Sequence, residues 1–300
     1  MDSVGIIGLG ALGTLFADEF KQSGLEPLIL ADPERAQRLR AQGRTVNGRH
    51  IDLTVATPDQ GRELSLILVA TKFGGLEAAM DTMTPFVGPK TRILSVINGV
   101  ESENRLAERF GWDRVLLATA QGMDAVFTGS SLTCAMPGKI VLGEREPGPV
   151  SERARETADF LNAHHIRAEA VEDMARRQWG KLMLNAGINQ AVTVFEGDYG
   201  TVQRPGKARE CMLGAMREVQ TLSGLLGYPI SEEEYQGWVA LADSLSPEGK
   251  PSMRQDAEAG RKTEVELFAG TVVREAARFS LPVPVNAWLY ERIREMEAAM

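Results

Sequence analysis

A glycine-rich turn near the N-terminus constrains the fold of this chain more than any other segment. The turn, Gly8-Leu9-Gly10-Ala11-Leu12-Gly13, fits the pattern G-x-G-x-x-G between an apolar, strand-like segment at 4–7 and a helical stretch at 11–22. In that context the first glycine makes the tight turn, the second lets a pyrophosphate approach the backbone, and the third lets the helix pack closely on the strand. Free N–H groups at the helix start then face the phosphates. The pattern therefore predicts a dinucleotide site made by Gly8, Leu9, Gly10, Ala11, Leu12 and Gly13, with a purely structural turn as the less favoured alternative.

Strand-like and helix-like segments alternate through the first half of the chain. Apolar runs at 27–31, 64–71 and 92–97 are separated by stretches of helical composition. This alternation predicts parallel strands with helices on both faces of the sheet. We expect short strands within 116–143 to finish the same sheet, followed by a helix opened by Ser151 and a last strand at 166–171.

The second half has helical periodicity and almost no strand signal. Three hundred residues are about two domains' worth of chain. We place the boundary near residue 172, with a dinucleotide-binding domain over 1–172 and an all-helical domain over 173–300 that carries substrate and catalytic residues. The predicted fold class is α/β, a Rossmann-type doubly wound parallel sheet followed by an all-helical C-terminal domain.

The composition of the chain argues against nucleic acid, membranes and metal ions as binding partners. The formal net charge of −8 disfavours nucleic acid, because the phosphate backbone is repelled. No apolar run approaches the ~18 residues of a membrane span, and the N-terminus lacks the pattern of a signal peptide, so we expect a cytoplasmic protein that does not enter membranes. Two cysteines and three histidines occur in no metal-ligand spacing, so no metal site is expected.

Asp32 ends the second predicted strand, where a carboxylate usually binds the adenosine ribose hydroxyls. A carboxylate there repels the 2′-phosphate of NADPH, by about 4 kcal/mol for unit charges 4 Å apart at an effective dielectric of 20. This favours NAD or the use of both cofactors. Arg35 is the alternative, because its guanidinium could offset the repulsion and grip a phosphate. Asp32 could also be the N-cap of a helix that begins at Pro33.

Lys72 and Asn98 follow the next two predicted strands. Ligands of open α/β sheets bind outside the carboxyl ends of the strands, so we expect both residues to contact the cofactor, and Asn98 also the substrate. A solvated surface lysine and an ordinary Asn-Gly turn are the alternatives.

A polar stripe runs along the predicted helix at 173–195. Lys181, Asn185 and Asn189 recur every four residues on a helix that is otherwise mostly apolar and expected to be buried. Because an unpartnered buried amide costs about 1–3 kcal/mol, the stripe must face something polar. One hypothesis is a solvated edge. The other is a cleft against the nucleotide domain, in which Lys181 donates a proton and the asparagines orient a small polar substrate.

A second polar cluster comprises Ser252-Met253-Arg254-Gln255-Asp256 and Thr263-Glu264-Val265-Glu266, which we expect on one later helix. Ser252 and Gln255 have the spacing of a capping box, so a helix N-cap is the alternative to a substrate contact by Ser252. Glu264 is a candidate partner for Lys181, because a neighbouring carboxylate keeps a buried lysine charged.

Together these motifs resemble those of the ketopantoate reductases (2-dehydropantoate 2-reductases), in family order and over nearly the full chain. The matching segments are the glycine-rich turn, Thr71-Lys72, Asn98-Gly99-Val100, Trp179-Gly180-Lys181-Leu182 with Asn185 and Asn189, Ser252-Met253-Arg254-Gln255-Asp256, and Gly260-Arg261-Lys262-Thr263-Glu264. Three residues depart from the family pattern. Asp32 stands where an arginine usually meets the 2′-phosphate, Gln190 replaces a proline, and Tyr199 lies near a usual substrate-binding asparagine.

The resemblance implies an NAD(P)H-dependent reduction of ketopantoate to pantoate, a step of pantothenate biosynthesis. It implies that Lys181 is the general acid, and that Asn98, Asn185, Asn189, Ser252 and Glu264 bind substrate. The glycine-rich turn, Lys72 and Asn98 would bind NADPH. The alternatives are a reductase of another branched 2-oxo acid, a hydroxyacid dehydrogenase, and a dinucleotide-binding protein without turnover. A homodimer is compatible with the apolar helices of the second domain.

Overall fold

A computed structural model describes residues 1–299 and divides the chain into two compact units, Met1–Ala175 and Arg176–Met300. The division falls inside α6 (Met174–Val194). It lies three residues beyond the boundary expected at 172, because this one long helix begins in the first unit and continues into the second.

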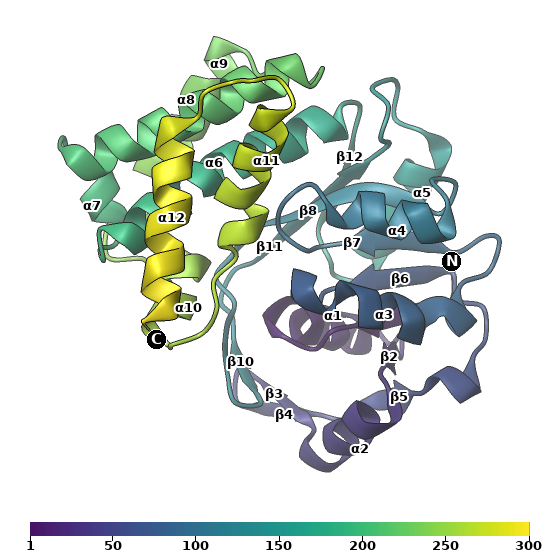
Figure 1. Ribbon diagram of the computed structural model, residues 1–300. Helices are drawn as coiled ribbons and strands as arrows, with labels where there is room; N and C mark the ends of the chain where they lie inside the picture. Colours follow the sequence, from purple (N-terminus) through teal and green to yellow (C-terminus); the bar gives the residue numbers. More distant parts are fainter. Residues whose placement is uncertain (300) are drawn as a thin grey trace. The chain divides into compact units, whose positions relative to one another are not determined.

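The first unit is built on an eight-stranded sheet with the order β12-β11-β8-β7-β6-β1-β2-β5 (Figure 1). The strands from β5 to β8 are parallel, β11 is antiparallel to β8, and β12 is parallel to β11. This confirms the doubly wound sheet. The strands are β1 (Val4–Ile7), β2 (Leu28–Leu30), β5 (Thr54–Ala56), β6 (Leu66–Val69), β7 (Arg92–Ser95), β8 (Val115–Met123), β11 (Pro137–Gly143) and β12 (Ala168–Val171).

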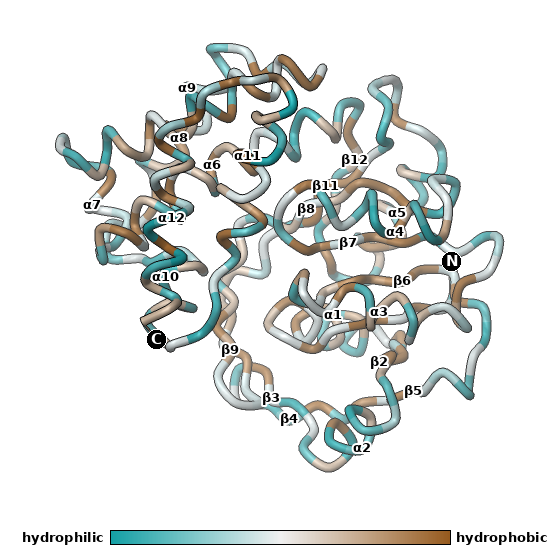
Figure 2. Tube along the Cα trace, viewed as in Figure 1, coloured by the Kyte–Doolittle hydropathy of each residue, from teal (hydrophilic) through white to brown (hydrophobic). Residues whose placement is uncertain are grey.

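Helices cover both faces of this sheet because its central strands are apolar on both sides. Val4 and Ile6 belong to a core with the buried residues of α1, α2 and α5, whereas Ile7, which is also buried, lies on the opposite side of the strand. Figure 2 shows the hydrophobic character of β6 and β7. Ser151 caps α5 as expected, since its side chain accepts a hydrogen bond from the N–H of Ala154. The helices are α1 (Ala11–Gln22), α2 (Pro33–Gln42), α3 (Leu76–Met83), α4 (Ser102–Phe110) and α5 (Glu152–Ala163), with short 3-10 turns at η1 (Pro58–Gln60), η2 (Phe73–Gly75) and η3 (Thr84–Phe86).

A second, four-stranded sheet corrects one expectation. Strands β9 (Val126–Thr128) and β10 (Ser131–Thr133) do not finish the main sheet; they join β3 (Arg44–Val46) and β4 (Arg49–Ile51) in the order β4-β3-β10-β9. The β3–β4 hairpin turns at Asn47-Gly48, both with positive φ, 48° and 81°. An Asn-Gly pair between short strands is a strong hairpin signal, so the β3–β4 hairpin could have been predicted from the sequence.

In its described residues, 176–299, the second unit consists of helices and connecting loops without a strand, as expected. Two glycines let other side chains approach α6: a Cβ on Gly180 would meet the Trp238 ring at 2.6 Å, and one on Gly187 would meet Met216 at 2.5 Å. In residues 1–299, no helix combines the length and hydropathy that a membrane crossing requires. After α6 the elements are α7 (Tyr199–Gln203), α8 (Lys207–Leu225), α9 (Glu232–Asp243), α10 (Ser252–Glu258), η4 (Val265–Leu267), α11 (Ala269–Ala277) and α12 (Pro284–Ala298).

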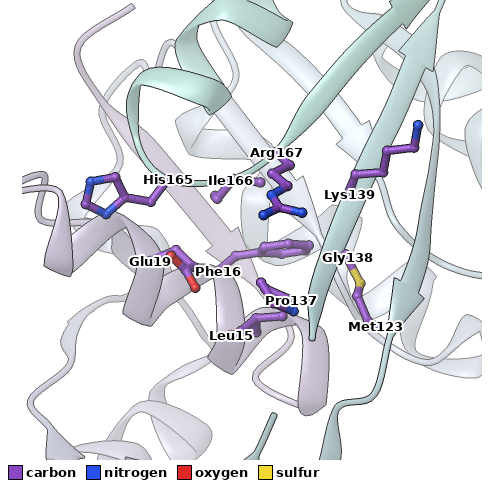
Figure 3. A pocket seen from close by; sticks show the side chains of 10 residues that line it. All are labelled: Leu15, Phe16, Glu19, Met123, Pro137, Gly138, Lys139, His165, Ile166 and Arg167. Carbon is purple, nitrogen blue, oxygen red and sulfur yellow. The ribbon is translucent and has the colours of Figure 1, made fainter. Parts of the chain in front are cut away.

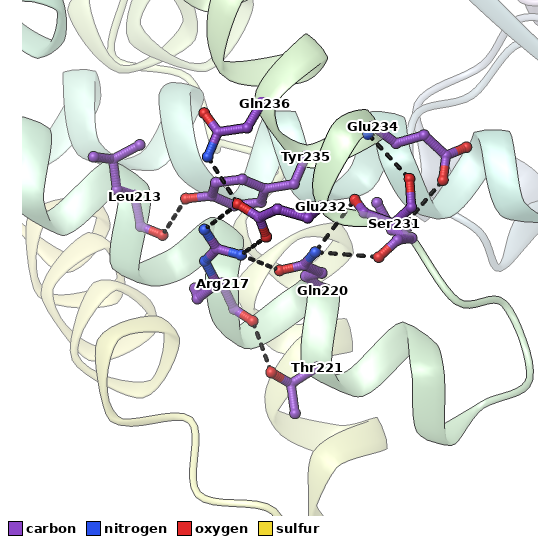
Figure 4. Close-up of polar contacts among 10 residues, drawn as sticks. Leu213, Arg217, Gln220, Thr221, Ser231, Glu232, Glu234, Tyr235 and Gln236 are labelled. Carbon is purple, nitrogen blue, oxygen red and sulfur yellow. Dashed lines mark hydrogen bonds and ion pairs between the residues drawn. The ribbon is translucent and has the colours of Figure 1, made fainter.

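Polar contacts fasten α9 to α8 (Figure 4). Arg217 on α8 makes an ion pair with Glu232 in the first turn of α9, and its guanidinium lies 3.6 Å from the centre of the Tyr235 ring. The Tyr235 hydroxyl donates to the carbonyl of Leu213 at 3.2 Å. The pKa of Glu232 is lowered to about 2, chiefly by the hydrogen bond from Arg217 and then by that from Gln236.

Candidate active site

The glycine-rich turn has a geometry that only glycine permits at its first and last positions. Gly8 has φ of +93°, and a Cβ there would meet the backbone of Ala70 and Thr71 at 2.6 Å. A Cβ on Gly13 would lie 1.8 Å from the carbonyl oxygen of Gly8. Gly8 therefore lets the turn lie against the backbone that follows β6, and Gly13 lets α1 pack against the end of β1.

Gly10 is different, because a Cβ at this position would meet nothing within 4 Å. The fold itself does not require glycine here. Gly10 is the N-cap of α1, and no side chain caps this helix. Open space beside an uncapped helix start leaves room for a phosphate on the helix N–H groups, which is the role expected of the second glycine.

Four of the predicted cofactor elements lie at the carboxyl edge of neighbouring strands. Ile7 at the end of β1 pairs with Leu30 on one side and Val69 on the other, and Val69 pairs with Ser95. Asp32, the glycine-rich turn, Lys72 and Asn98 follow these four strand ends. Three strand spacings separate the outermost of them by roughly 14 Å. The chain order reverses between β1 and β6, and such a switch point is where open α/β sheets bind ligands.

Three hydroxyls near this edge are buried and make no hydrogen bond: those of Thr14, Thr71 and Thr119. Thr14 and Thr119 are 0% and 4% exposed. Burying an unpaired hydroxyl is costly, so each marks a place where a ligand can supply the missing partner. Thr14 follows the glycine-rich turn, and Thr71 precedes Lys72. Thr119 is the middle residue of β8, three residues after Leu116, which pairs with Leu94 of β7. The sequence analysis did not identify these threonines as site residues, since burial without a partner leaves no periodic pattern.

The residues around Asp32 carry charges of both signs. Asp32 is exposed and caps α2, because its Oδ1 accepts a hydrogen bond from the N–H of Arg35 at 2.8 Å. The N-cap alternative is therefore confirmed. Capping uses one carboxylate oxygen of Asp32, so the other can still accept a hydrogen bond from the ribose. Arg44 is 8% exposed, and its pKa is lowered by burial first and by the positive charge of Arg35 second. A phosphate near Arg35 would thus meet two guanidinium groups as well as the Asp32 carboxylate.

These features fit a nicotinamide dinucleotide. The turn offers space and N–H donors for a pyrophosphate, and the strand edge is long enough for an extended molecule. The buried threonine hydroxyls can form hydrogen bonds with such a ligand. The fit rests on the first unit alone.

The same unit has a small pocket between α1, the end of β8, the start of β11 and the residues before β12 (Figure 3). Its free volume of about 10 Å³ holds about one water molecule. Burial raises the pKa of Glu19, which lines it, and the neighbouring Asp18 adds to the effect. The lining residues are Leu15, Phe16, Glu19, Met123, Pro137, Gly138, Lys139, His165, Ile166 and Arg167.

In the second unit, α6 presents the predicted polar stripe from a largely buried helix. Trp179 and Met183 are buried, as is Asn189, which is only 6% exposed. Lys181 and Asn185 are half-buried. The stripe therefore runs from two half-buried side chains to one buried amide, with one ammonium group and two amides in line.

Ser252 and Glu264 are placed differently from expectation. The N-cap of α10 is Pro251, and the Gln255 side chain donates to the Lys250 carbonyl at 2.9 Å, so the capping-box alternative for Ser252 is wrong. The expectation of one helix over the whole cluster is wrong too. Gly260, with φ of +63°, ends the helix, and the N–H of Arg261 returns to the carbonyl of Asp256. Ser252 is therefore an exposed residue in the first turn of α10, and Glu264 directly precedes η4.

Two departures from the family pattern have structural roles. Gln190 is fully buried, donates to the Ala186 carbonyl at 2.7 Å and accepts from the N–H of Ala269 at 3.1 Å. It thereby joins α6 to the first residue of α11. Burial raises the pKa of Tyr199, and the N–H of Tyr199 donates to the carbonyl of Gly249 at 2.9 Å.

Neither cysteine is a candidate nucleophile. Burial raises the pKa of Cys134 and that of Cys211 to about 11, so almost all of each thiol stays protonated at neutral pH. Among residues 1–299 there is also no group of three or more His, Cys, Asp or Glu side chains placed to hold a metal ion.

Comparison with known families gives matches over both units. Residues 4–147 match the family described as "Ketopantoate reductase PanE/ApbA", and residues 173–297 match "Ketopantoate reductase PanE/ApbA C terminal". The 2-dehydropantoate 2-reductase of Archaeoglobus fulgidus is 28% identical over 305 aligned positions, which cover 99% of this chain and 98% of that protein. The corresponding enzyme of Aquifex aeolicus is 22% identical, with 97% and 96% covered.

Solved structures share the fold over the full chain. A ternary complex of D-mandelate dehydrogenase with NADH and anilino(oxo)acetate has a TM-score of 0.88 at 20% identity, with 99% of this chain and 98% of that one covered. The 2-dehydropantoate 2-reductase of Geobacter metallireducens has a TM-score of 0.86 at 24% identity, with 98% and 99% covered.

Proposed function

Because this chain belongs to the ketopantoate reductase family, whose members are NAD(P)H-dependent oxidoreductases acting on CH–OH groups, we propose that it reduces 2-dehydropantoate (ketopantoate) to pantoate. The observation that carries the proposal is the stripe of Lys181, Asn185 and Asn189 on a largely buried helix. This set of one acid and two amides suits a small, polar 2-oxo acid. The reaction would place the protein in pantothenate biosynthesis, in the cytoplasm.

The first unit would hold the dinucleotide. The turn from Gly8 to Gly13, including Leu9, Ala11 and Leu12, would receive the pyrophosphate, and Asp32 the adenosine ribose. Lys72 and Asn98 would contact the part of the cofactor beyond the switch point. When bound, the reduced nicotinamide supplies the hydride that the ketone carbon accepts.

Lys181 would be the general acid. Its ammonium group donates a proton to the ketone oxygen as that oxygen becomes the hydroxyl of the product. Asn185, Asn189, Ser252 and Asn98 would bind the carboxylate and hydroxyl groups of the substrate through neutral donors, which fix its orientation. Glu264 would keep Lys181 protonated and in place.

The direct test is Lys181→Ala in the purified full-length chain. General acid catalysis is typically worth 10²–10⁴ in rate, so turnover of ketopantoate should fall by roughly that factor. Dinucleotide affinity should stay within about twofold of native, because the glycine-rich turn is untouched. Lys207→Ala removes an exposed lysine of the same unit and serves as the matched control. Near-native turnover in Lys181→Ala would refute the assignment.

A different 2-oxo acid is the second candidate substrate, and Tyr199 is the observation that favours it. This bulky, half-buried residue lies near where the family usually has a substrate-binding asparagine. Initial rates with ketopantoate, other branched 2-oxo acids and phenylglyoxylate, each with NADH and NADPH, distinguish the candidates. Dinucleotide binding without any turnover across this panel would favour a binding protein. Sedimentation of the same preparation tests the predicted homodimer.

A further inference from the structure

Glu264 lies in a segment that has no regular helix on its N-terminal side. It follows the end of α10 by several residues and directly precedes the 3-10 turn η4. The position of this carboxylate therefore depends on what holds residues 263–268. We propose that the C-terminal helix α12 holds this segment, with Glu297 as the positioning residue for Glu264. The proposal rests on the proposed function, in which Glu264 acts on Lys181 and the substrate.

Glu297 binds the residue directly before Glu264 at two points. Its Oε1 accepts a hydrogen bond from the backbone N–H of Thr263 at 2.7 Å and another from the Thr263 hydroxyl at 2.7 Å. The same hydroxyl oxygen accepts from the N–H of Val265 at 3.3 Å. Hydrogen bonds to an ionised carboxylate are about twice as strong as neutral ones. Glu297 thus fixes the backbone on both sides of Glu264, directly at Thr263 and through the hydroxyl at Val265.

A second contact from α12 reaches the same segment two residues after Glu264. Glu266 accepts a hydrogen bond from the Tyr290 hydroxyl at 2.9 Å and makes an ion pair with Arg294 at 2.5 Å. Both partners of that ion pair are 54% exposed, so water and salt screen it. We therefore assign the main positioning role to Glu297, which is half-buried.

The far end of the segment is fixed from α6, which carries Lys181. The carbonyl of Glu264 accepts from the N–H of Leu267 at 2.9 Å, and the N–H of Ala269 donates to buried Gln190 on α6. The backbone around Glu264 is thus tied to α6 at one end and to α12 at the other. Loss of Glu297 removes the hydrogen bonds at Thr263, whereas the contact with Gln190 at the α6 end remains.

Amide hydrogen exchange tests the contact without reference to activity. In Glu297→Ala, the Thr263 amide should exchange at least about tenfold faster than in the native chain, because it loses its acceptor. The Val265 amide should also exchange faster, because the Thr263 hydroxyl that accepts from it loses the bond that orients it. Glu295→Ala is the matched control, since Glu295 lies on the same helix and pairs only with the exposed Arg292 among the ion pairs of the described residues. Its exchange rates at 263–265 should equal the native ones. Native rates at these amides in Glu297→Ala would overturn the proposal.

Kinetics test the positioning role. In Glu297→Ala, kcat/KM for ketopantoate should fall about tenfold while KM for the dinucleotide stays native. Thr263→Val, which removes the hydroxyl, should show a smaller loss of the same kind, and Thr263→Ser, which keeps it, should be close to native. The two Thr263 variants also test the positioning role if Glu297→Ala does not fold. Faster exchange with unchanged kcat/KM would overturn the positioning role. A native chain that reduces no 2-oxo acid would instead count against the proposed function, and the exchange rates would still decide whether α12 holds the segment.

Discussion

At the scale of single residues, the three glycines of the turn are constrained by different neighbours. Gly8 and Gly13 are held by backbone atoms that leave no room for a side chain, whereas Gly10 faces open space. Gly10→Ala should therefore lower the melting temperature only slightly, because the new methyl group displaces no neighbour and the cost is limited to that of alanine at a helix N-cap. The added methyl group should weaken NADH binding at least about tenfold, or 1.4 kcal/mol, by occupying the space for the pyrophosphate. Isothermal titration with NADH measures it.

Two other glycine variants show whether that loss is specific. Gly148→Ala adds a methyl group to open space elsewhere in the same unit and should bind NADH normally. Gly13→Ala should lower the melting temperature, since its Cβ would lie 1.8 Å from a carbonyl oxygen. Native affinity in Gly10→Ala would mean that the pyrophosphate does not approach this residue.

Cofactor choice is also decided by single residues. Asp32 should make the native chain prefer NADH, and Asp32→Ala should move the ratio of kcat/KM values towards NADPH. Asp32→Asn is the sharper variant, because it removes the charge and keeps a side-chain oxygen for the α2 N-cap. Removing a repulsion of about 1 kcal/mol, the value for unit charges 4 Å apart in water, changes the ratio about fivefold. A native chain already selective for NADPH would show that Arg35, with Arg44, outweighs the carboxylate.

At the scale of elements, helices and strands were predicted correctly where the residues that determine them lie close together in the sequence. Helix α1 has its predicted bounds, and α6 differs by one residue at each end, because glycine, capping residues and apolar periodicity all act within a few residues. The separate sheet of β3, β4, β9 and β10 was missed as a pairing, since it joins segments more than 80 residues apart in the chain. Register between distant strands leaves no mark in either segment alone.

The candidate site shows the same division. The glycine-rich turn and the stripe on α6 were identified from spacing. The break after α10 was not, although Gly260 is a standard helix-ending residue. The unpaired hydroxyls of Thr14 and Thr119 could be found only once burial was known.

The attachment of α9 to α8 should depend on pH through Glu232. Its pKa is lowered from the ordinary 4.5 to about 2, so the native state holds this carboxylate ionised. The stability from its contact with Arg217 is therefore fully present above about pH 4.5 and is lost as the pH falls towards 2. Glu232→Gln should melt below the native chain at pH 7, and the difference should vanish near pH 2. Glu233→Gln, in the same helical turn, should show no such pH-dependent difference.

At the scale of the whole molecule, cofactor binding should stabilise the chain against heat. A ligand at 100 times its Kd adds about 2.7 kcal/mol to the stability of the state that binds it. Calorimetry with saturating NADH should therefore move the transition of the unit that holds the glycine-rich turn upwards by several degrees, since each kcal/mol is worth about 2–4 °C for a domain of 150–250 residues. Gly10→Ala should show little shift at the same NADH concentration. An equal shift in that variant would place the NADH site elsewhere.

The two native cysteines, one buried and one half-buried, make this chain a convenient host for site-specific labels. With pKa values of about 11, Cys134 and Cys211 react slowly with maleimides at neutral pH, whereas a cysteine introduced on the surface, with a pKa near 8.5, reacts readily. One dye placed on each unit could then be attached without first removing the native cysteines. Energy transfer between the dyes would report the distance between the two units during turnover, because the native cysteines remain unlabelled.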